Sequence, residues 1–298
     1  MSTAERIRRR AAAARAVREF FAARGVTEVH TPPVTESGVT DVHIESVALA
    51  DGRFLRTSPE FAHKRLLAAG AGDLYEFGPV FRAGERGGMH REQFWMIEWY
   101  RVGWSWRNLA DEAVALVETI ASGRKWRTVR IAWRELMQSA AGLALETASD
   151  RELAEVADDA PQGLDRPELL DWLFATRVQP HLPEDRITIV YDYPACQAAL
   201  ARLNPADPRF AERFEVFAGP VELANGYREL TDAEEQRRRF EADNRRRAAL
   251  GRAPMPVDES LLAALERGLP ECAGVALGFE RLLMVANAAG SIDAVAID

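Results

Sequence analysis

The chain has 298 residues, with 38 Lys and Arg against 46 Asp and Glu, so its net charge is −8. Apolar residues make up 47% of it, which is typical of a folded globular protein and excludes a chain that is disordered throughout. The absence of a run of about 18 apolar residues excludes a membrane-spanning helix, and the acidic balance argues against a generally basic surface for nucleic acid. Cys196 and Cys272 belong to no CxxC pair, so we expect a reducing, cytoplasmic location.

The first segment, residues 1–24, is rich in Ala and Arg and has two interpretations. Ser2 and Glu5 have the spacing of a capping box, and apolar residues recur at helical spacing as far as Phe21. The alternative is a transit peptide, but Glu5 and Glu19 are acidic and the segment lacks an apolar h-region. We therefore predict a structural helix that ends near Gly25.

Short strands and one helix are predicted in the next part of the chain. Thr31-Pro32-Pro33 forces an extended backbone, and Asp51-Gly52 is a strong signal for a hairpin turn. Ser58-Pro59-Glu60 opens a helix to about residue 69, because it supplies a cap, a first-turn proline and an acidic side chain. The predicted strands span residues 26–30, 43–49, 53–57, 74–82 and 94–100, the last two separated by a polar, glycine-rich loop.

The second half of the chain alternates helices with a few strands. Residues 132–178 are predicted to be mostly helical, with breaks near Gly142 and Pro161, and Thr231 with Glu234 has capping-box spacing. The remaining helices are predicted at residues 106–121, 231–250, 258–267 and 280–289, and the strands at residues 186–193, 213–217, 221–227 and 274–278. We predict one α+β domain, residues 1–298, with a mainly antiparallel sheet flanked by helices.

Carboxylates occur inside several strand-like runs. Glu215 and Glu222 lie on the two arms of one predicted hairpin, and Glu229 follows; Glu60 and Glu98 raise the same question. A carboxylate that points into a core must be paired or must hold a cation, and paired carboxylates suit an oxygen-preferring ion such as Mg²⁺. The alternative is that these side chains point outward on a solvated face.

A second group of residues suits a phosphate-bearing ligand. Arg82 ends a predicted strand and offers a planar donor fork for phosphate or carboxylate, and Phe94 is an aromatic side chain that can stack on a purine. His90 lies between them in the loop. Far downstream, the glycines of the 274–278 strand allow a ligand to approach the backbone, and Arg281 follows on a helix.

Together these segments resemble the sequence motifs of class II aminoacyl-tRNA synthetases. Residues 81–100, with Phe81-Arg82 at their start and Glu98-Trp99-Tyr100 at their end, resemble motif 2. Residues 274–281 resemble motif 3, and the first helix with Pro32-Pro33 resembles motif 1. The resemblance implies a class II synthetase-like catalytic domain over nearly the whole chain.

The lysine branch of that group resembles this chain most closely. Thr57-Ser58-Pro59-Glu60 and the stretches 213–215 and 222–233 carry that likeness. A lysyl-tRNA synthetase has an N-terminal OB-fold that reads the anticodon, whereas here the motif 1 helix begins at the N-terminus, so no OB-fold is expected. The chain thus resembles the elongation factor P (R)-β-lysine ligase family, a truncated class II lysyl-tRNA synthetase paralogue that attaches (R)-β-lysine to a lysine of elongation factor P (EF-P).

The resemblance implies a role for each matched residue. Arg82 and Arg281 would be catalytic, and Glu215 and Glu222 would hold Mg²⁺. ATP would contact Arg82, His90, Arg91, Phe94, Glu222, Leu223, Asn225, Gly278 and Arg281, with the adenine between Phe94 and Arg281. The amino acid would contact Ser58, Glu60, Glu98, Tyr100, Glu229 and Ala276, with its distal ammonium on Tyr100 and Glu229.

The resemblance also implies a reaction and its partners. An ATP-dependent ligase would activate lysine or (R)-β-lysine as an aminoacyl-adenylate and transfer it to a lysine side chain of EF-P. A homodimer is expected, with neither stable nucleic-acid binding nor a membrane. Two alternatives stay open: a ligase of the same fold with tRNA or a small molecule as acceptor, and a non-catalytic paralogue.

Two departures from the family pattern bear on those alternatives. The acid that usually follows the motif 2 arginine is replaced by Gly84, with Glu85 one residue later, and Arg91 stands where an Asn is usual. The Arg-rich helix at residues 237–247 has two interpretations as well, a surface for an acidic partner or a solvated helix interspersed with acidic residues.

Overall fold

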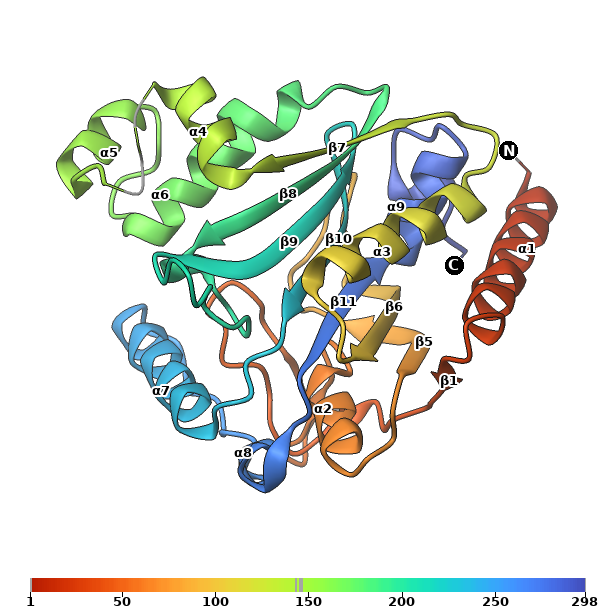
Figure 1. The fold of residues 1–298 in the computed structure, drawn as a ribbon, viewed down its shortest axis with the longest axis horizontal. Helices are drawn as coiled ribbons and strands as arrows, with labels where there is room; N and C mark the ends of the chain where they lie inside the picture. The colour runs from red at the N-terminus through yellow and green to blue at the C-terminus, as the bar shows by residue number, and fades with distance from the viewer. Residues whose placement is uncertain (1, 143, 145–146, 298) are drawn as a thin grey trace.

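The computed structural model describes residues 2–142, 144 and 147–297, and its main feature is a large mixed sheet (Figure 1). In these residues the sheet has eight strands, in the order β1-β5-β6-β11-β10-β9-β8-β7. Neighbouring strands are antiparallel except β1–β5 and β7–β8, which are parallel. The strands are β1 (Thr27–Glu28), β5 (Leu74–Phe81), β6 (Gln93–Val102), β7 (Arg127–Ala132), β8 (Arg186–Pro194), β9 (Phe210–Ala218), β10 (Val221–Arg228) and β11 (Cys272–Gly278). The predicted α+β class with a mainly antiparallel sheet is confirmed.

One layer of helices packs on the main sheet, and the main apolar core lies between this layer and the sheet. The layer consists of α1 (Thr3–Ala22), α3 (Trp106–Ile120) and α9 (Phe279–Ala286). The predicted cap of α1 is confirmed, because the Ser2 hydroxyl accepts a hydrogen bond from the Glu5 amide. Phe21 on this helix stacks on Tyr75 of the sheet, with ring centroids 4.2 Å apart. Burial of such apolar faces supplies most of the driving force for this layer.

A second group of helices packs at the other end of the central strands. It consists of α2 (Glu60–Ala68), α7 (Ala233–Ala249) and α8 (Glu259–Gly268), which share an apolar cluster that includes Leu67 and Phe240. The predicted cap of α7 is wrong by one residue. Asp232, not Thr231, is the N-cap, and its carboxylate accepts from the Glu235 amide.

The arginines of α7 are largely satisfied within the molecule. Arg237 pairs with Glu259, and Arg238 and Arg239 both pair with Glu235. Further along the helix, Arg246 pairs with Asp165 and Glu168, and the buried Arg247 with Glu45. These ion pairs favour the interpretation of α7 as a structural helix over that of a surface held ready for an acidic partner.

The segment between β7 and β8 forms a helical layer with its own core. It contains α4 (Trp133–Ala141), α5 (Asp150–Val156) and α6 (Arg166–Leu173), followed by a short π-helical turn at Phe174–Val178. The predicted break at Gly142 is confirmed, since this glycine ends α4 with a φ of 71°. The strand β7 was not predicted; its sequence carries two arginines and no clear alternation, and pairing with β8 decides its conformation.

A small sheet lies beside the main one and contains the predicted hairpin. The strands β2 (Val34–Thr35), β4 (Phe54–Leu55) and β3 (Val47–Ala48) pair antiparallel in that order. The predicted strand at residues 43–49 is therefore shorter than expected, and the strand at 26–30 contracts to β1. Residues 38–46 instead bond to α7, for example through Thr40 and Asp243. No helix in the described part of the chain is long and apolar enough to cross a bilayer.

Candidate active site

A cavity of about 820 Å³ lies over the centre of the main sheet, between α2, the motif 2 loop and the small sheet. Its walls include every residue predicted from the sequence to bind ATP or the amino acid. These residues are Ser58, Glu60, Arg82, His90, Arg91, Phe94, Glu98, Tyr100, Glu222, Leu223, Asn225, Glu229, Ala276, Gly278 and Arg281. Glu215 is the predicted site residue that does not line the cavity.

Strand register explains how distant segments converge here. Glu76, Glu98, Ala276, Asn225 and Glu215 are successive cross-strand partners on β5, β6, β11, β10 and β9. Directly opposite residues project on the same face of a sheet. One row of the sheet therefore carries carboxylates at both ends and a small side chain in the middle, on the face that the cavity occupies.

Cationic and aromatic groups gather at one end of the cavity. Arg82 lies over the Phe94 ring, with its guanidinium carbon 5.2 Å from the centroid. Arg281 donates to the Glu222 carboxylate at 3.2 Å and contacts Nε2 of His90 at 2.7 Å. Burial and the charge of Arg281 lower the pKa of His90, so this imidazole is neutral near pH 7. The end is thus suited to a planar base and to phosphate.

The altered motif 2 loop has a defined arrangement. Gly84 adopts a left-handed φ of 79° and its amide donates to Glu92 at 3.0 Å. Glu85 lies beside Arg82, with their charged atoms 3.7 Å apart. Glu85, which stands one residue later than the acid of the family pattern, therefore still lies beside Arg82. Arg91, which stands where an Asn is usual, lines the cavity.

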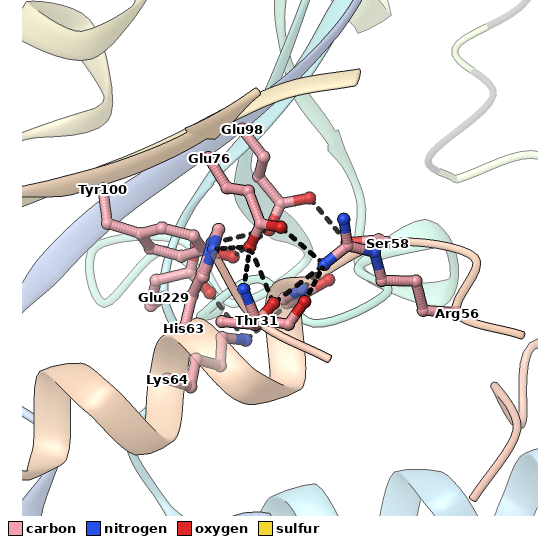
Figure 2. Close-up of polar contacts among 10 residues, drawn as sticks. Thr31, Arg56, Ser58, His63, Lys64, Glu76, Glu98, Tyr100 and Glu229 are labelled. Atoms are coloured by element: carbon pink, nitrogen blue, oxygen red, sulfur yellow. Dashed lines mark hydrogen bonds and ion pairs between the residues drawn. The ribbon is translucent and has the colours of Figure 1, made fainter. Parts of the chain in front are cut away.

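Buried carboxylates gather at the opposite end (Figure 2). Glu98 is 2% exposed and accepts hydrogen bonds from the Ser58 hydroxyl at 2.5 Å and the Tyr100 hydroxyl at 2.9 Å. Burial raises the pKa of Tyr100, and the surrounding carboxylates add to this, so the phenol stays a donor. Behind Glu98 lies the fully buried His63, which contacts Glu76 at 3.1 Å and Glu98 at 3.4 Å.

Glu229 and Glu60 form the second part of this acidic end. Glu229 is 1% exposed, and its Oε2 lies 2.7 Å from Nζ of Lys64, which also contacts Glu60 at 2.7 Å. Burial raises the pKa of Glu229 to about 7, while Lys64 works against that shift. Gly274 makes room for this arrangement, because a Cβ there would lie 2.5 Å from Glu229. This acidic end of the cavity can therefore accept ammonium groups.

Glu215 is held on the neighbouring strand. Its carboxylate accepts from the Tyr193 hydroxyl at 2.6 Å and from Arg213 at 2.5 Å, and Arg213 also reaches Asn225 at 3.3 Å. Burial raises its pKa to about 7; Arg213 opposes this shift and the charge of Glu222 adds to it. Glu215 is buried and Glu222 partly exposed, so the outward-facing alternative fails for Glu215.

Sequence reasoning missed several polar residues, of which Arg56 and Thr31 line the cavity and Glu76, His63 and Lys64 lie behind its wall. Arg56 pairs with Glu76 at 2.7 Å, and the Thr31 hydroxyl donates to the same carboxylate at 2.7 Å. His63 and Lys64 on α2 were also missed. One signal was present for Lys64, since it stands four residues after Glu60, the spacing of neighbouring residues on a helix.

Comparison with known proteins gives a consistent result. The sequence profile of the family described as "tRNA synthetases class II (D, K and N)" matches residues 1–297. A Vibrio cholerae protein named "Elongation factor P--(R)-beta-lysine ligase" is 43% identical over 97% of this chain and 93% of its own length. Proteins of the same name from Klebsiella pneumoniae strain MGH 78578 and Photorhabdus laumondii are 42% and 43% identical, over 95% and 91% of this chain and 91% and 87% of their own. The chain therefore belongs to the class II tRNA synthetase family and, within it, to the elongation factor P–(R)-β-lysine ligases.

Proposed function

We propose that the protein is an ATP-dependent ligase that activates lysine or (R)-β-lysine as an aminoacyl-adenylate and transfers it to a lysine side chain of EF-P. The observation that carries this proposal is the polarity of one cavity. Arg82 and Arg281 line one end, and the buried carboxylates Glu98 and Glu229 line the other. A diamino acid meets carboxylates with its ammonium groups while its own carboxylate points toward the arginines.

The first step joins the amino acid to ATP. Arg82 binds the α-phosphate and the substrate carboxylate, and Arg281 with Phe94 holds the adenine. One oxygen of the substrate carboxylate attacks the α-phosphorus; the new O–P bond forms as the bond to pyrophosphate breaks. Arg is suited to this role because its planar guanidinium stays charged at all relevant pH values. Catalysis is then mainly positioning and electrostatic stabilisation of phosphate charge.

The second step transfers the aminoacyl group. The acceptor amine attacks the carbonyl carbon of the adenylate, AMP leaves as the C–O bond breaks, and the amine nitrogen loses a proton. The amine has to arrive deprotonated to be a nucleophile. The enzyme needs no covalent intermediate of its own, and neither Cys196 nor Cys272 is among the cavity-lining residues.

Magnesium is proposed as the companion of ATP. The described residues contain no group of three or more His, Cys, Asp and Glu side chains that could hold a metal ion. Mg²⁺, however, keeps several waters and needs only one or two protein carboxylates in addition to phosphates. Glu222 on β10 and Glu215 on β9, where Glu215 is the cross-strand partner of Asn225, fit that donor requirement and would hold the ion. Bound there, it would neutralise phosphate charge.

Further features belong to the same proposal. We infer a homodimer built on the motif 1 helix, a cytoplasmic location, a single catalytic domain over residues 1–298 and no stable nucleic-acid binding. EF-P is the acceptor because the curated relatives carry it in their names. No feature of the cavity favours tRNA or a small molecule over a protein lysine as acceptor.

Two measurements test the function. Amino-acid-dependent exchange of pyrophosphate into ATP, run with α-lysine, (R)-β-lysine and a panel of other amino acids, reports the first step. Exchange with the lysine isomers is expected; no exchange with any amino acid would show a non-catalytic paralogue. Purified EF-P is then added and its mass measured. A gain of one lysyl unit supports the proposal, whereas exchange without any change in EF-P would point to another acceptor.

A further inference from the structure

Lys64 lies directly behind two carboxylates of the amino-acid end of the cavity. Its side chain is 0% exposed, and its Nζ lies 2.7 Å from Glu229 Oε2 (Figure 2). The same Nζ lies 2.7 Å from Glu60 Oε1. Both glutamates line the cavity and Lys64 does not. The lysine thus contributes a charge to the site without exposing an atom to a substrate.

Lys64, Glu60 and Glu229 form a triad whose charges do not cancel. When both glutamates are deprotonated, two carboxylates face one ammonium, which leaves one negative charge at the cavity wall. Glu229 Oε1 accepts no hydrogen bond within the described part of the chain. The other buried cations nearby are committed elsewhere, since Arg56 pairs with Glu76 and His63 lies between Glu76 and Glu98. One further ammonium group would therefore balance the triad.

The position of Lys64 also sets the geometry of the triad. Glu60 is at the start of α2 and Glu229 follows β10, so the two carboxylates come from elements far apart in the sequence. Like charges brought together in a buried site repel each other and take up protons unless a cation separates them. Lys64 supplies that cation from the next turn of α2.

We propose that Lys64 is a positioning residue that fixes the spacing of Glu60 and Glu229 and leaves them a single negative charge with which to bind one ammonium group of the substrate. This inference rests on the proposed function, because it assumes an amino-acid substrate with a second amino group. It adds that a fully buried lysine, which touches no substrate, determines the net charge of the site formed by Glu60 and Glu229. The pocket would accept side chains that end in an ammonium and reject neutral ones of the same length.

The alternative is that Lys64 is only a buried structural ion pair, and pH dependence separates the two. The titratable groups that face Lys64 and Glu229 are Glu60 and His63 on α2, Glu98 and Tyr100 on β6, Tyr227 on β10 and Cys272 on β11. Burial raises the pKa values of Tyr100, Tyr227 and Cys272, so these three stay neutral near pH 7. Substrate ammonium binds the deprotonated carboxylates, so KM for the amino acid falls as pH rises through their pKa.

The test compares Lys64→Met and Lys64→Arg in pyrophosphate exchange, with Lys125→Met as the matched control because Lys125 is the other lysine of the chain and is exposed. Without Lys64 the carboxylates lose the cation that lowers their pKa. The pH at which KM falls should then move up by one unit or more, which is about a tenfold rise in KM for lysine at pH 7. KM for ATP and the exchange rate at saturating lysine should change much less. Lys64→Arg should restore most of the wild-type profile, and Lys125→Met should match the wild type throughout.

Each outcome decides the question. A KM and a pH profile equal to those of the wild type in a folded Lys64→Met protein would overturn the inference, and so would equal losses in lysine KM, ATP KM and rate. If Lys64→Met does not fold, Lys64→Gln keeps a donor for the carboxylates without the charge, and the same shift is expected from it. The wild-type reaction separates this inference from the proposed function. If the wild type supports no exchange, the proposed function fails. The inference about Lys64 is then tested by calorimetric titration of lysine into the wild type and Lys64→Gln across pH 6–9, where the pH at which lysine affinity rises should be higher for the variant.

Discussion

Glu98 and Ala276 are direct cross-strand partners at the centre of the main sheet, and both line the cavity. Glu98 is nearly fully buried and is held by Ser58 and Tyr100, so its carboxylate cannot move far to admit a larger substrate. The methyl group of Ala276 therefore lies next to a rigid anionic group. Any amino group that binds to Glu98 has to share space with that methyl group.

This neighbourhood predicts the effect of Ala276→Gly. An α-amino group needs the space beside the α-carbon, whereas a β-amino group leaves from the next carbon and avoids the methyl. One methyl group in a pocket is worth about 1–3 kcal/mol, so the variant should raise activation of α-lysine relative to (R)-β-lysine by about 10- to 200-fold. Pyrophosphate exchange with both isomers measures the ratio. A ratio that stays constant would show that Ala276 serves only strand packing.

Glu222→Gln should abolish adenylate formation and leave the fold intact. Glu222 is partly exposed and its structural partner Arg281 has a second bond to the backbone carbonyl of residue 222, so the fold does not depend on the carboxylate. The substitution removes one of two proposed Mg²⁺ ligands. Exchange activity and thermal unfolding are measured together, with Glu241→Gln on the surface of α7 as control. Normal activity in Glu222→Gln would refute the metal assignment.

Gly274→Ala should weaken amino-acid binding. A Cβ at this position would lie 2.3 Å from Cε1 of Tyr100 and 2.5 Å from Oε1 of Glu229, closer than any real contact. One of these two side chains has to move, and both belong to the proposed ammonium site. KM for lysine is expected to rise at least tenfold, or about 1.4 kcal/mol, with KM for ATP nearly unchanged. Gly123→Ala, where a Cβ meets nothing within 4 Å, should have no effect.

Glu76→Gln tests the buried network behind the cavity. Burial works to raise the pKa of Glu76, but hydrogen bonds from His63 and Thr31 and the charge of Arg56 outweigh it and lower the pKa to about 2. A carboxyl whose folded pKa is depressed stabilises the fold above its unfolded pKa, and this contribution is lost as pH falls toward 2. Near neutral pH the variant should lose about 3 kcal/mol of unfolding free energy, because breaking a buried ion pair leaves Arg56 uncompensated. Urea unfolding at several pH values should show the gap closing between about pH 4.5 and pH 2. A gap that is independent of pH would contradict this account.

Light scattering tests the proposed dimer. The resemblance of the first helix to motif 1 implies a two-fold interface there, and oligomers with closed two-fold symmetry are the commonest. We expect a mass of two chains at micromolar concentration. A single-chain mass there would exclude the dimer without affecting the assignment of the cavity.

Local signals in the sequence determined much of the fold and the identity of most site residues. The Asp51-Gly52 turn, the Ser2 cap and the glycine that ends α4 act over a few residues, so they are readable without a structure. The site residues could be named from their resemblance to a family, and all of them except Glu215 line the cavity. Element lengths were less predictable, because strands such as β1 and β3 extend only as far as they find a partner.

The tertiary structure alone decided which charges meet. Asp232 rather than Thr231 caps α7, and β7 is a strand because β8 lies beside it. Glu215 is held by Arg213 and Tyr193 and does not itself line the cavity, and Lys64 is enclosed between Glu60 and Glu229. These outcomes depend on pairing between residues far apart in the chain and on burial, which strengthens each electrostatic contact and penalises each unpaired charge. A sequence pattern records the groups that are available, whereas only the folded chain determines their partners.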